Sequence, residues 1–212
     1  MSIFTAFLAK SSTIDRRGQS FIEAMVAITI IVTSVASALT LVQSSVTATH
    51  NGGIQVVAAN LAREGLEVVR AARDTNWLKG NSFQVGLVDP GGTNRKDARP
   101  ILNLATGDWT LSFTVIPPDL SNAVVYDTTD GLYVQADAQP SGAASSPYTR
   151  VLTLNHLCRD GSTGVERIVG GVLTCSGTET LVGLSVDSKV RWRQPGGTYR
   201  QLTVTERFYD WR

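Results

Sequence analysis

A run of uncharged residues near the N-terminus is the feature that most constrains what this 212-residue chain can fold into. Residues 24–42 are 19 consecutive uncharged and mainly apolar positions, and Lys, Arg, Asp or Glu does not occur again until Arg63. As a helix the run is about 28 Å long, which is close to the thickness of the hydrocarbon core of a bilayer. The run can therefore span a membrane as a single helix.

The charges around the run indicate which end of the chain stays in the cytoplasm. Lys10, Arg16 and Arg17 precede the run, whereas no Lys or Arg follows Val42 for twenty residues. By the positive-inside rule the N-terminus is cytoplasmic and the bulk of the chain is exported. The formal net charge of the whole chain is +1, so bulk charge gives no reason to expect nucleic acid as a partner.

Two interpretations treat this N-terminus as an ordinary export signal. The run can be an uncleaved signal anchor, or it can be a cleaved signal peptide whose small residues at 36–38 form the cleavage site. Neither interpretation explains why apolar residues continue past Ala38. Neither explains Glu23 at the start of the run, where a carboxylate is costly and is expected to serve a function.

The stretch GQSFIE at residues 18–23 resembles the type III signal of type IV prepilins. The resemblance implies a leader peptide at residues 1–18, cleavage between Gly18 and Gln19 by prepilin peptidase, and N-methylation of Gln19. Most members of that family begin the mature chain with phenylalanine, where this chain has Gln19. Glu23 is then the fifth mature residue, and the resemblance implies that it pairs with the terminal ammonium of an adjacent subunit in the filament.

Helical periodicity resumes after the run. Residues 54–76 place apolar side chains on one face and alternating charges on another, which predicts an amphipathic helix lying on a soluble core. Between the two stretches, Asn51-Gly52-Gly53 predicts a bend or hinge within one long helix, or a short loop. Residues 59–78, ANLAREGLEVVRAARDTNWL, resemble the second half of the N-terminal helix in a group of uncharacterised prepilin-like proteins.

Beyond about residue 80 the pattern changes to the period of two that is typical of strands. The alternating segments are 109–116, 131–136, 149–155, 190–192 and 202–208, and turn sequences separate them. Residues 138–147 lack bulky side chains and predict a surface loop.

The expected fold class is α+β in a pilin-like lollipop. A long N-terminal helix at 19–78, with 19–46 as the transmembrane or filament-core part, packs its amphipathic part on an antiparallel sheet head at 79–212.

The only two cysteines, Cys158 and Cys175, lie in the part of the chain expected to be exported. Two thiols in an oxidising compartment more often pair than remain free, so we expect a disulfide between them. Pilins frequently carry such a bridge near the C-terminus.

No motif for catalysis or a cofactor stands out. His50 and His156 are isolated, and no zinc ligand set is available if both cysteines are bridged. Asp127 and Asp130 are expected to form a turn rather than a calcium site. Four arginines, Arg191, Arg193, Arg200 and Arg207, could form a strip that contacts DNA, but a solvated strand edge is the favoured interpretation.

These features together predict a type IV pilus or pseudopilus subunit, structural or minor, that works by assembly and has no catalytic activity or cofactor. The expected partners are identical or related pilin subunits, prepilin peptidase, the inner-membrane assembly machinery and the membrane. The expected location is a single pass in the cytoplasmic membrane before assembly and an extracellular filament or the cell surface afterwards. The alternative is a monomeric surface-binding domain, held by a signal anchor or secreted after cleavage at Ala38.

Overall fold

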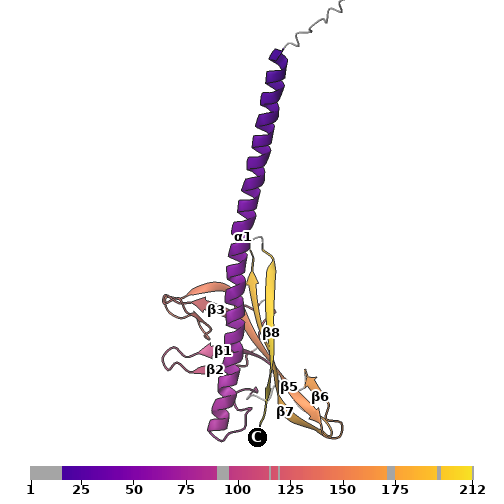
Figure 1. Ribbon diagram of the computed structural model, residues 1–212. Helices are drawn as coiled ribbons and strands as arrows, with labels where there is room; N and C mark the ends of the chain where they lie inside the picture. The colour runs from indigo at the N-terminus through magenta and orange to yellow at the C-terminus, as the bar shows by residue number, and fades with distance from the viewer. Residues whose placement is uncertain are drawn as a thin grey trace, which may run out of the picture. The chain divides into compact units, whose positions relative to one another are not determined.

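The computed structural model contains one long helix followed by an antiparallel sheet (Figure 1). The structure describes residues 16–89, 96–114, 116–118, 120–170, 175–194 and 197–211, with side chains from residue 20 onward. Helix α1 covers Arg16–Leu78. The strands within the described residues are β1 (Asp97–Leu102), β2 (Trp109–Ser112), β3 (Val124–Asp127), β4 (Tyr133–Val134), β5 (Ala144–Asp160), β6 (Glu166–Val169), β7 (Glu179–Arg193) and β8 (Tyr199–Tyr209). The predicted α+β class is confirmed.

Helix α1 has no proline along its whole length, and it ends where glycine allows the chain to turn. Gly80 has a φ of 73°, in the left-handed region that glycine adopts without a steric penalty. The Gly80 N–H donates to the Trp77 carbonyl at 3.0 Å, and the Asn81 N–H donates to the Asn76 carbonyl at 2.9 Å. These bonds satisfy carbonyls of the last helical turn, and the chain then turns toward the sheet.

The loop or unwound hinge considered at Asn51-Gly52-Gly53 is not observed, because all three residues are helical within α1. No atom lies within 4 Å of the Cβ position of Gly52 or Gly53, so packing imposes no other conformation there. The chain nevertheless divides into two compact units between these glycines. The unit from Gly53 to Arg212 is called the head unit below.

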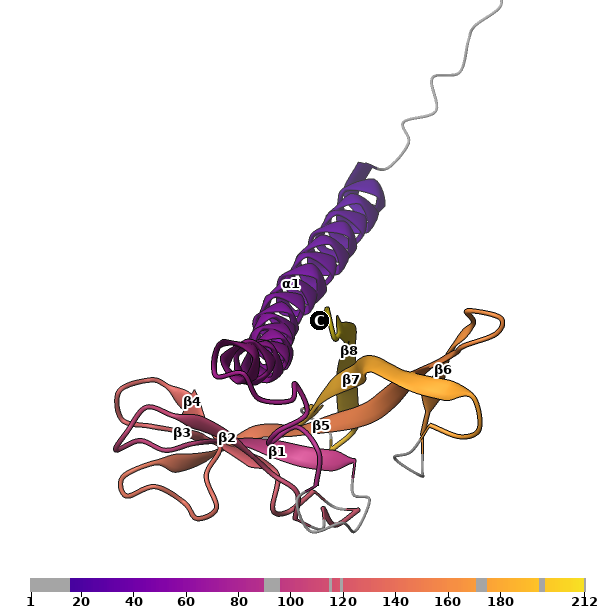
Figure 2. The same cartoon turned by 90° about the horizontal axis from the view of Figure 1, so that it is seen from below.

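Strand β5 organises the sheet of the head unit. One of its edges pairs in succession with β3, β1 and β6, and its other edge pairs with β7, which in turn pairs with β8. Strands β2 and β4 extend the sheet from β1 and β3. All of these pairs are antiparallel, and Figure 2 shows β3 and β4 toward one end of the sheet and β6 toward the other.

The alternating segments locate five of the strands, but β1, β3 and β6 were not predicted. β1 contains Pro100 and does not alternate, and β3 and β6 have only four residues each. The loop expected at 138–147 is wrong in its second half, because β5 begins at Ala144. Ala144 and Ser145 pair with β3 through the backbone, which requires no bulky side chain.

The head half of α1 covers one face of the sheet. One core cluster joins Leu66 and Val69 of α1 to Leu152, Val186 and Phe208 of the sheet, among others. A second joins α1 residues around Leu61 to the sheet. Its buried members are Ala58, Leu61, Ala62, Val125, Tyr148, Val190 and Trp192. The amphipathic face predicted for residues 54–76 is thus the face that is buried.

Gly65 is the point of closest approach between α1 and the sheet. A Cβ atom placed there would lie 2.8 Å from both Leu152 Cδ2 and Ser188 Oγ. Leu152 and Ser188 are themselves fully buried, so neither has free space to move into. Glycine at this position sets the depth at which the helix can sit.

Replacing Gly65 with alanine is expected to destabilise the head unit. Overpacking a buried contact costs about 1–3 kcal/mol, against roughly 1 kcal/mol that alanine gains over glycine in a helix. The measurement is urea unfolding of the full chain in detergent, followed by tryptophan fluorescence. All four tryptophans lie beyond residue 53, so the signal reports the head unit alone.

Gly53→Ala is the matched control, because its new Cβ meets no atom within 4 Å. Helix propensity alone then acts, and the unfolding midpoint should stay the same or rise. Equal midpoints for the two variants would show that the close approach at Gly65 does not affect the free energy of unfolding.

Candidate functional site

The apolar half of α1, residues 20–49, is exposed at every position. Its best window has a mean hydropathy of 2.3 and is long and apolar enough to cross a membrane. The large exposed side chains are Phe21, Ile22, Met25, Val26, Ile28, Ile30, Ile31, Val32, Val35, Leu39, Leu41, Val42 and Val46. An apolar surface of this extent is not stable in water, so it marks a site that lipid or protein must cover.

Seven hydroxyl groups of this half donate to carbonyls of the same helix. Thr29 donates to the Met25 carbonyl at 2.8 Å, and Ser37 donates to the Thr33 carbonyl at the same distance. The same pattern holds for Thr33, Ser34, Thr40, Thr47 and Thr49. Hydroxyls satisfied in this way can enter an apolar environment without losing a hydrogen bond.

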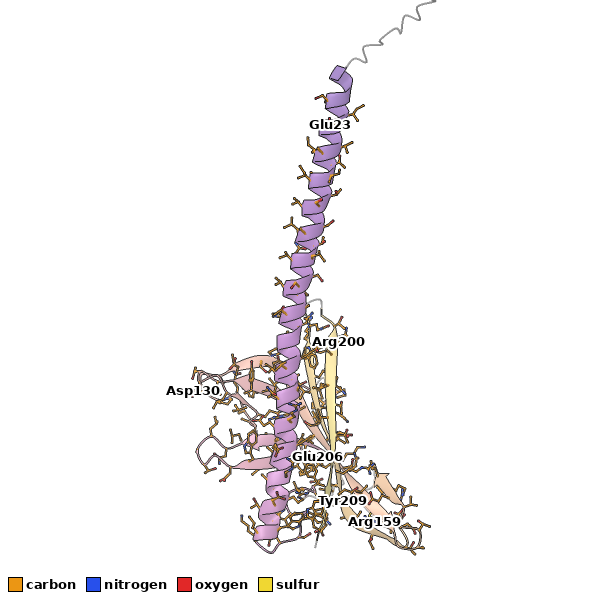
Figure 3. The ribbon with its side chains drawn as sticks, viewed as in Figure 1. Glu23, Asp130, Arg159, Arg200, Glu206 and Tyr209 are labelled. Carbon is orange, nitrogen blue, oxygen red and sulfur yellow. A yellow bond between two sulfur atoms is a disulfide. The ribbon has the colours of Figure 1, made fainter. Side chains whose placement is uncertain are left out.

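Glu23 is the exception to this apolar character (Figure 3). In the part of the chain that the structure describes, no hydrogen bond or ion pair to its carboxylate is found. Gly18 and Gln19, predicted for cleavage and methylation, fall in the first turns of α1, but their side chains lie outside the described part. Residues 1–15 of the expected leader also lie outside it.

A buried cation lies beneath the head half of α1. Arg150 of β5 is fully buried, and its Nη1 donates to the Leu61 carbonyl at 3.0 Å and to the Glu64 carboxylate. Its Nε donates to Gln135 Oε1 at 2.8 Å. Burial lowers the pKa of the Arg150 guanidinium, and the Glu64 carboxylate opposes that change. The positive charge of Arg150 can therefore be buried between the helix and the sheet, because the Glu64 carboxylate pairs with it.

This network explains the sequence Ala-Arg-Glu-Gly at residues 62–65. Ala62 is fully buried, Glu64 reaches Arg150, and Gly65 permits the close approach described above. Arg63 is exposed. Sequence reasoning did not identify Arg150 or Gln135 as important, although alternation with Tyr148 and Leu152 places Arg150 on the inward face of its strand.

A cavity of about 410 Å³ opens beside Glu64. Its walls come from α1, from Leu102 and Trp109, and from the turn between β3 and β4. The one carboxylate among its lining residues is Glu64, which is already bound to Arg150. The cavity therefore offers hydrophobic contact rather than acid–base chemistry.

The predicted disulfide between Cys158 and Cys175 is confirmed, with the two Cα atoms 5.6 Å apart. It lies near the hairpin that joins β5 to β6. In that hairpin the N–H groups of Thr163 and Ser162 donate to Asp160 and lower the pKa of its carboxyl to about 2. Ion pairs between Arg159 and Glu166 and between Arg167 and Glu179 flank the turn.

Asp127 and Asp130 lie in or beside a tight turn, as expected. Asp127 is the last residue of β3, and Asp130 lies within the connection to β4. The Gly131 N–H donates to the Thr128 carbonyl at 2.9 Å, and Gly131 has a φ of 75°. The described residues contain no group of three or more His, Cys, Asp or Glu placed to hold a metal ion.

Three of the four arginines considered on β7 and β8 contact other side chains of the head unit. Val190 and Trp192 are buried, and Arg191 and Arg193 alternate with them on the outward face of β7. Arg191 lies 4.1 Å from the centre of the Tyr199 ring. The two arginines of β8 also have partners. Arg200 donates to the side chain of Gln194, which follows β7, at 3.1 Å, and Arg207 lies 3.7 Å from the carboxylate of Glu166 in β6.

Comparison with known proteins gives no match: no family model, no curated protein and no solved structure is similar to this chain at a significant level. A long N-terminal apolar helix whose second half packs on an antiparallel sheet resembles a pilin-like layout.

Replacing Glu64 with alanine is expected to lower the stability of the head unit by about 2 kcal/mol. The change leaves the Arg150 guanidinium buried without its carboxylate, which in a fully buried pair costs about 3–5 kcal/mol. Glu64 is partly exposed, so water can partly replace its carboxylate and the expected loss is smaller. Glu67→Ala is the matched control, because its ion pair with Arg70 is on the surface and is worth at most about 1 kcal/mol. Urea unfolding measured by tryptophan fluorescence compares them, and equal losses would contradict a structural role for the buried pair.

Proposed function

We propose that this chain is a type IV pilin-like subunit, structural or minor, that is processed by prepilin peptidase and assembled into a surface filament. Its work is assembly rather than catalysis, and no cofactor takes part. The observation that carries the proposal is the apolar half of α1, residues 20–49, exposed at every position and interrupted by a single carboxylate at Glu23.

The apolar half of α1 has the surface expected of a helix that is covered by two different apolar environments in turn. A membrane covers it before assembly, and the helices of neighbouring subunits cover it afterwards. Hydroxyls bonded to the carbonyls of their own helix support this, because they need no partner in either setting. Small and hydroxyl-bearing residues also allow helices to approach closely.

Glu23 supports assembly over simple anchorage. An anchor has no use for a carboxylate at the start of its apolar run, and the described residues provide it with no partner. In the proposed filament the partner is the new N-terminal ammonium at Gln19 of an adjacent subunit. The pair makes burial of both charges tolerable.

The basic residues Lys10, Arg16 and Arg17 support insertion with the N-terminus in the cytoplasm. Prepilin peptidase then cuts on the cytoplasmic side, and the inner-membrane assembly machinery extracts the mature subunit. The head unit, with its disulfide, faces the oxidising side of the membrane and later the filament surface or cell surface. The partners are identical or related pilin subunits, and nucleic acid is not among them.

The competing function is a monomeric surface-binding domain with an export signal. Its apolar helix would serve as an anchor, or would be removed after Ala38. The position of the mature N-terminus separates these functions, because each one specifies a different first residue.

Mass spectrometry of the native protein is expected to find Gln19 at the N-terminus, carrying an added methyl group. Gly18 supplies the small residue before the cut, and residues 1–18 are absent from the mature chain. A terminus at Leu39 establishes the signal-peptide alternative, and an intact Met1 establishes the anchor.

Replacing Glu23 with glutamine is expected to leave insertion and cleavage intact, since a more apolar segment inserts at least as readily and Gly18 is unchanged. Assembly should fail, because each incoming subunit buries an uncompensated ammonium at a cost of about 3 kcal/mol. The measurement is the amount of the variant in sheared filaments relative to the amount of processed subunit in the membrane.

Ser34→Ala is the control for this experiment. Its hydroxyl donates to the Ile30 carbonyl of its own helix and carries no charge, so no charge is lost and incorporation should be normal. Normal incorporation of Glu23→Gln alongside normal processing would refute the charge-pair role.

A further inference from the structure

Strand β8 forms a long edge of the sheet. It pairs with β7 over all eleven residues from Tyr199 to Tyr209, with no shift in register. Among the described residues no other strand pairs with it, so its outer row of N–H and C=O groups has no strand partner. A regular edge of this length is a template for a further strand.

The side chains of β8 favour strand pairing rather than blocking it. The strand contains no proline, and its centre is Leu202-Thr203-Val204-Thr205, residue types with high or neutral strand propensity. Leu202 and Val204 are only partly buried against α1. Two opposite charges, Arg200 and Glu206, lie an even number of residues apart and therefore on the same face of the strand. Figure 3 labels both residues.

We propose that β8 pairs in antiparallel fashion with β8 of a second copy of this chain, centred on Thr203. In this register Arg200 of each copy faces Glu206 of the other, so the dimer gains two ion pairs. Leu202 faces Val204 twice on the same face. On the opposite face Tyr199 faces Arg207, Gln201 faces Thr205, and Thr203 faces itself. Opposite charges and apolar pairs directly across strands are the contacts that stabilise antiparallel sheets.

Neighbouring registers lack this complementarity. Centring on Val204 places Leu202 against Glu206, and centring on Leu202 places Arg200 against Val204, so each of these registers sets a charge against an apolar side chain. A register shifted by one residue would pair side chains from opposite faces of the two strands, which a two-fold dimer cannot do. Glu206 already accepts a bond from Arg70 through one carboxylate oxygen, and a carboxylate can accept further donors. The charges therefore select the register centred on Thr203.

The pairing also fixes the direction of the second copy. β8 runs in the same direction as the head half of α1, because Leu202 packs near Leu61 and the Phe208 ring lies 5.4 Å from the Arg73 guanidinium. A two-fold axis reverses the partner strand, and the partner's head half of α1 is reversed with it. The contact therefore joins subunits of opposite direction. In the proposed filament this would place the contact between two filaments lying side by side, rather than between neighbours within one. The pairing itself does not depend on the proposed function.

Single cysteine variants of the full chain in detergent test the register. Both native cysteines are bridged, so an introduced thiol is alone. Thr203→Cys faces itself in the proposed dimer and is expected to form a covalent dimer under mild oxidation, seen on a non-reducing gel. Gln201→Cys and Thr205→Cys are matched controls on the same exposed face, and each lies about 13 Å from its own copy. Neither should crosslink alone, but a mixture of the two should.

A charge-reversal experiment tests the ion pairs in the Thr203→Cys background. Arg200→Glu sets Glu against Glu and should abolish the crosslink, as Glu206→Arg should by setting Arg against Arg. An equimolar mixture of the two variants restores both opposite-charge pairs and should recover the crosslink, which misfolded chains cannot do. Absence of the Thr203→Cys dimer, equal crosslinking at residues 201 and 203, or no recovery in the mixture would overturn the proposal.

Discussion

The contact between α1 and β5 is the interaction on which the rest of the head unit depends. Gly65 lets the helix backbone reach the sheet, and this brings the Leu61 carbonyl and the Glu64 carboxylate within reach of Arg150. Gln135 then holds Arg150 from the other side, while its own amide donates to the carbonyls of Ala123 and Arg150 at 2.9 Å. One buried guanidinium thus ties together the helix, the central strand and the segments on either side of β3 and β4.

A single helix meets two different requirements along its length. In the head half, charge is buried and paired, and a glycine is needed because the sheet lies directly beneath it. In the apolar half, every described position is exposed and the hydroxyls are satisfied by the helix itself. Gly52 and Gly53 stand at the border, with no packing contact at their Cβ positions. The helix can therefore change its surroundings on one side of this border without disturbing the buried network on the other.

The sequence predicts the elements whose pattern is local and fails where pairing is distant. The apolar run and the 54–76 face are periodic over many residues, so α1 and its buried side could be predicted, as could much of strand β8 and the centre of β5. For β7 the alternation marked only residues 190–192, at the end of a strand that covers Glu179–Arg193. The Cys158 bridge followed from composition and compartment. Strands β1 and β3 form by backbone hydrogen bonding to β5, and backbone pairing does not require a particular pattern of side chains in the sequence. Arg150 was missed because its partners lie 86 residues away in α1 and 15 residues away at Gln135.

Apolar surfaces and charges have separate tasks in the two proposed contacts of this chain. The exposed apolar residues of α1 supply affinity, but an apolar stripe matches many offsets of a neighbouring helix almost equally well. A single carboxylate at Glu23 removes that freedom, because any offset that leaves it unpaired buries a lone charge. The β8 edge follows the same rule, since Leu202 and Val204 tolerate several registers whereas Arg200 and Glu206 tolerate one. In both places a few charges exclude the wrong arrangements, and specificity comes from that exclusion rather than from added affinity.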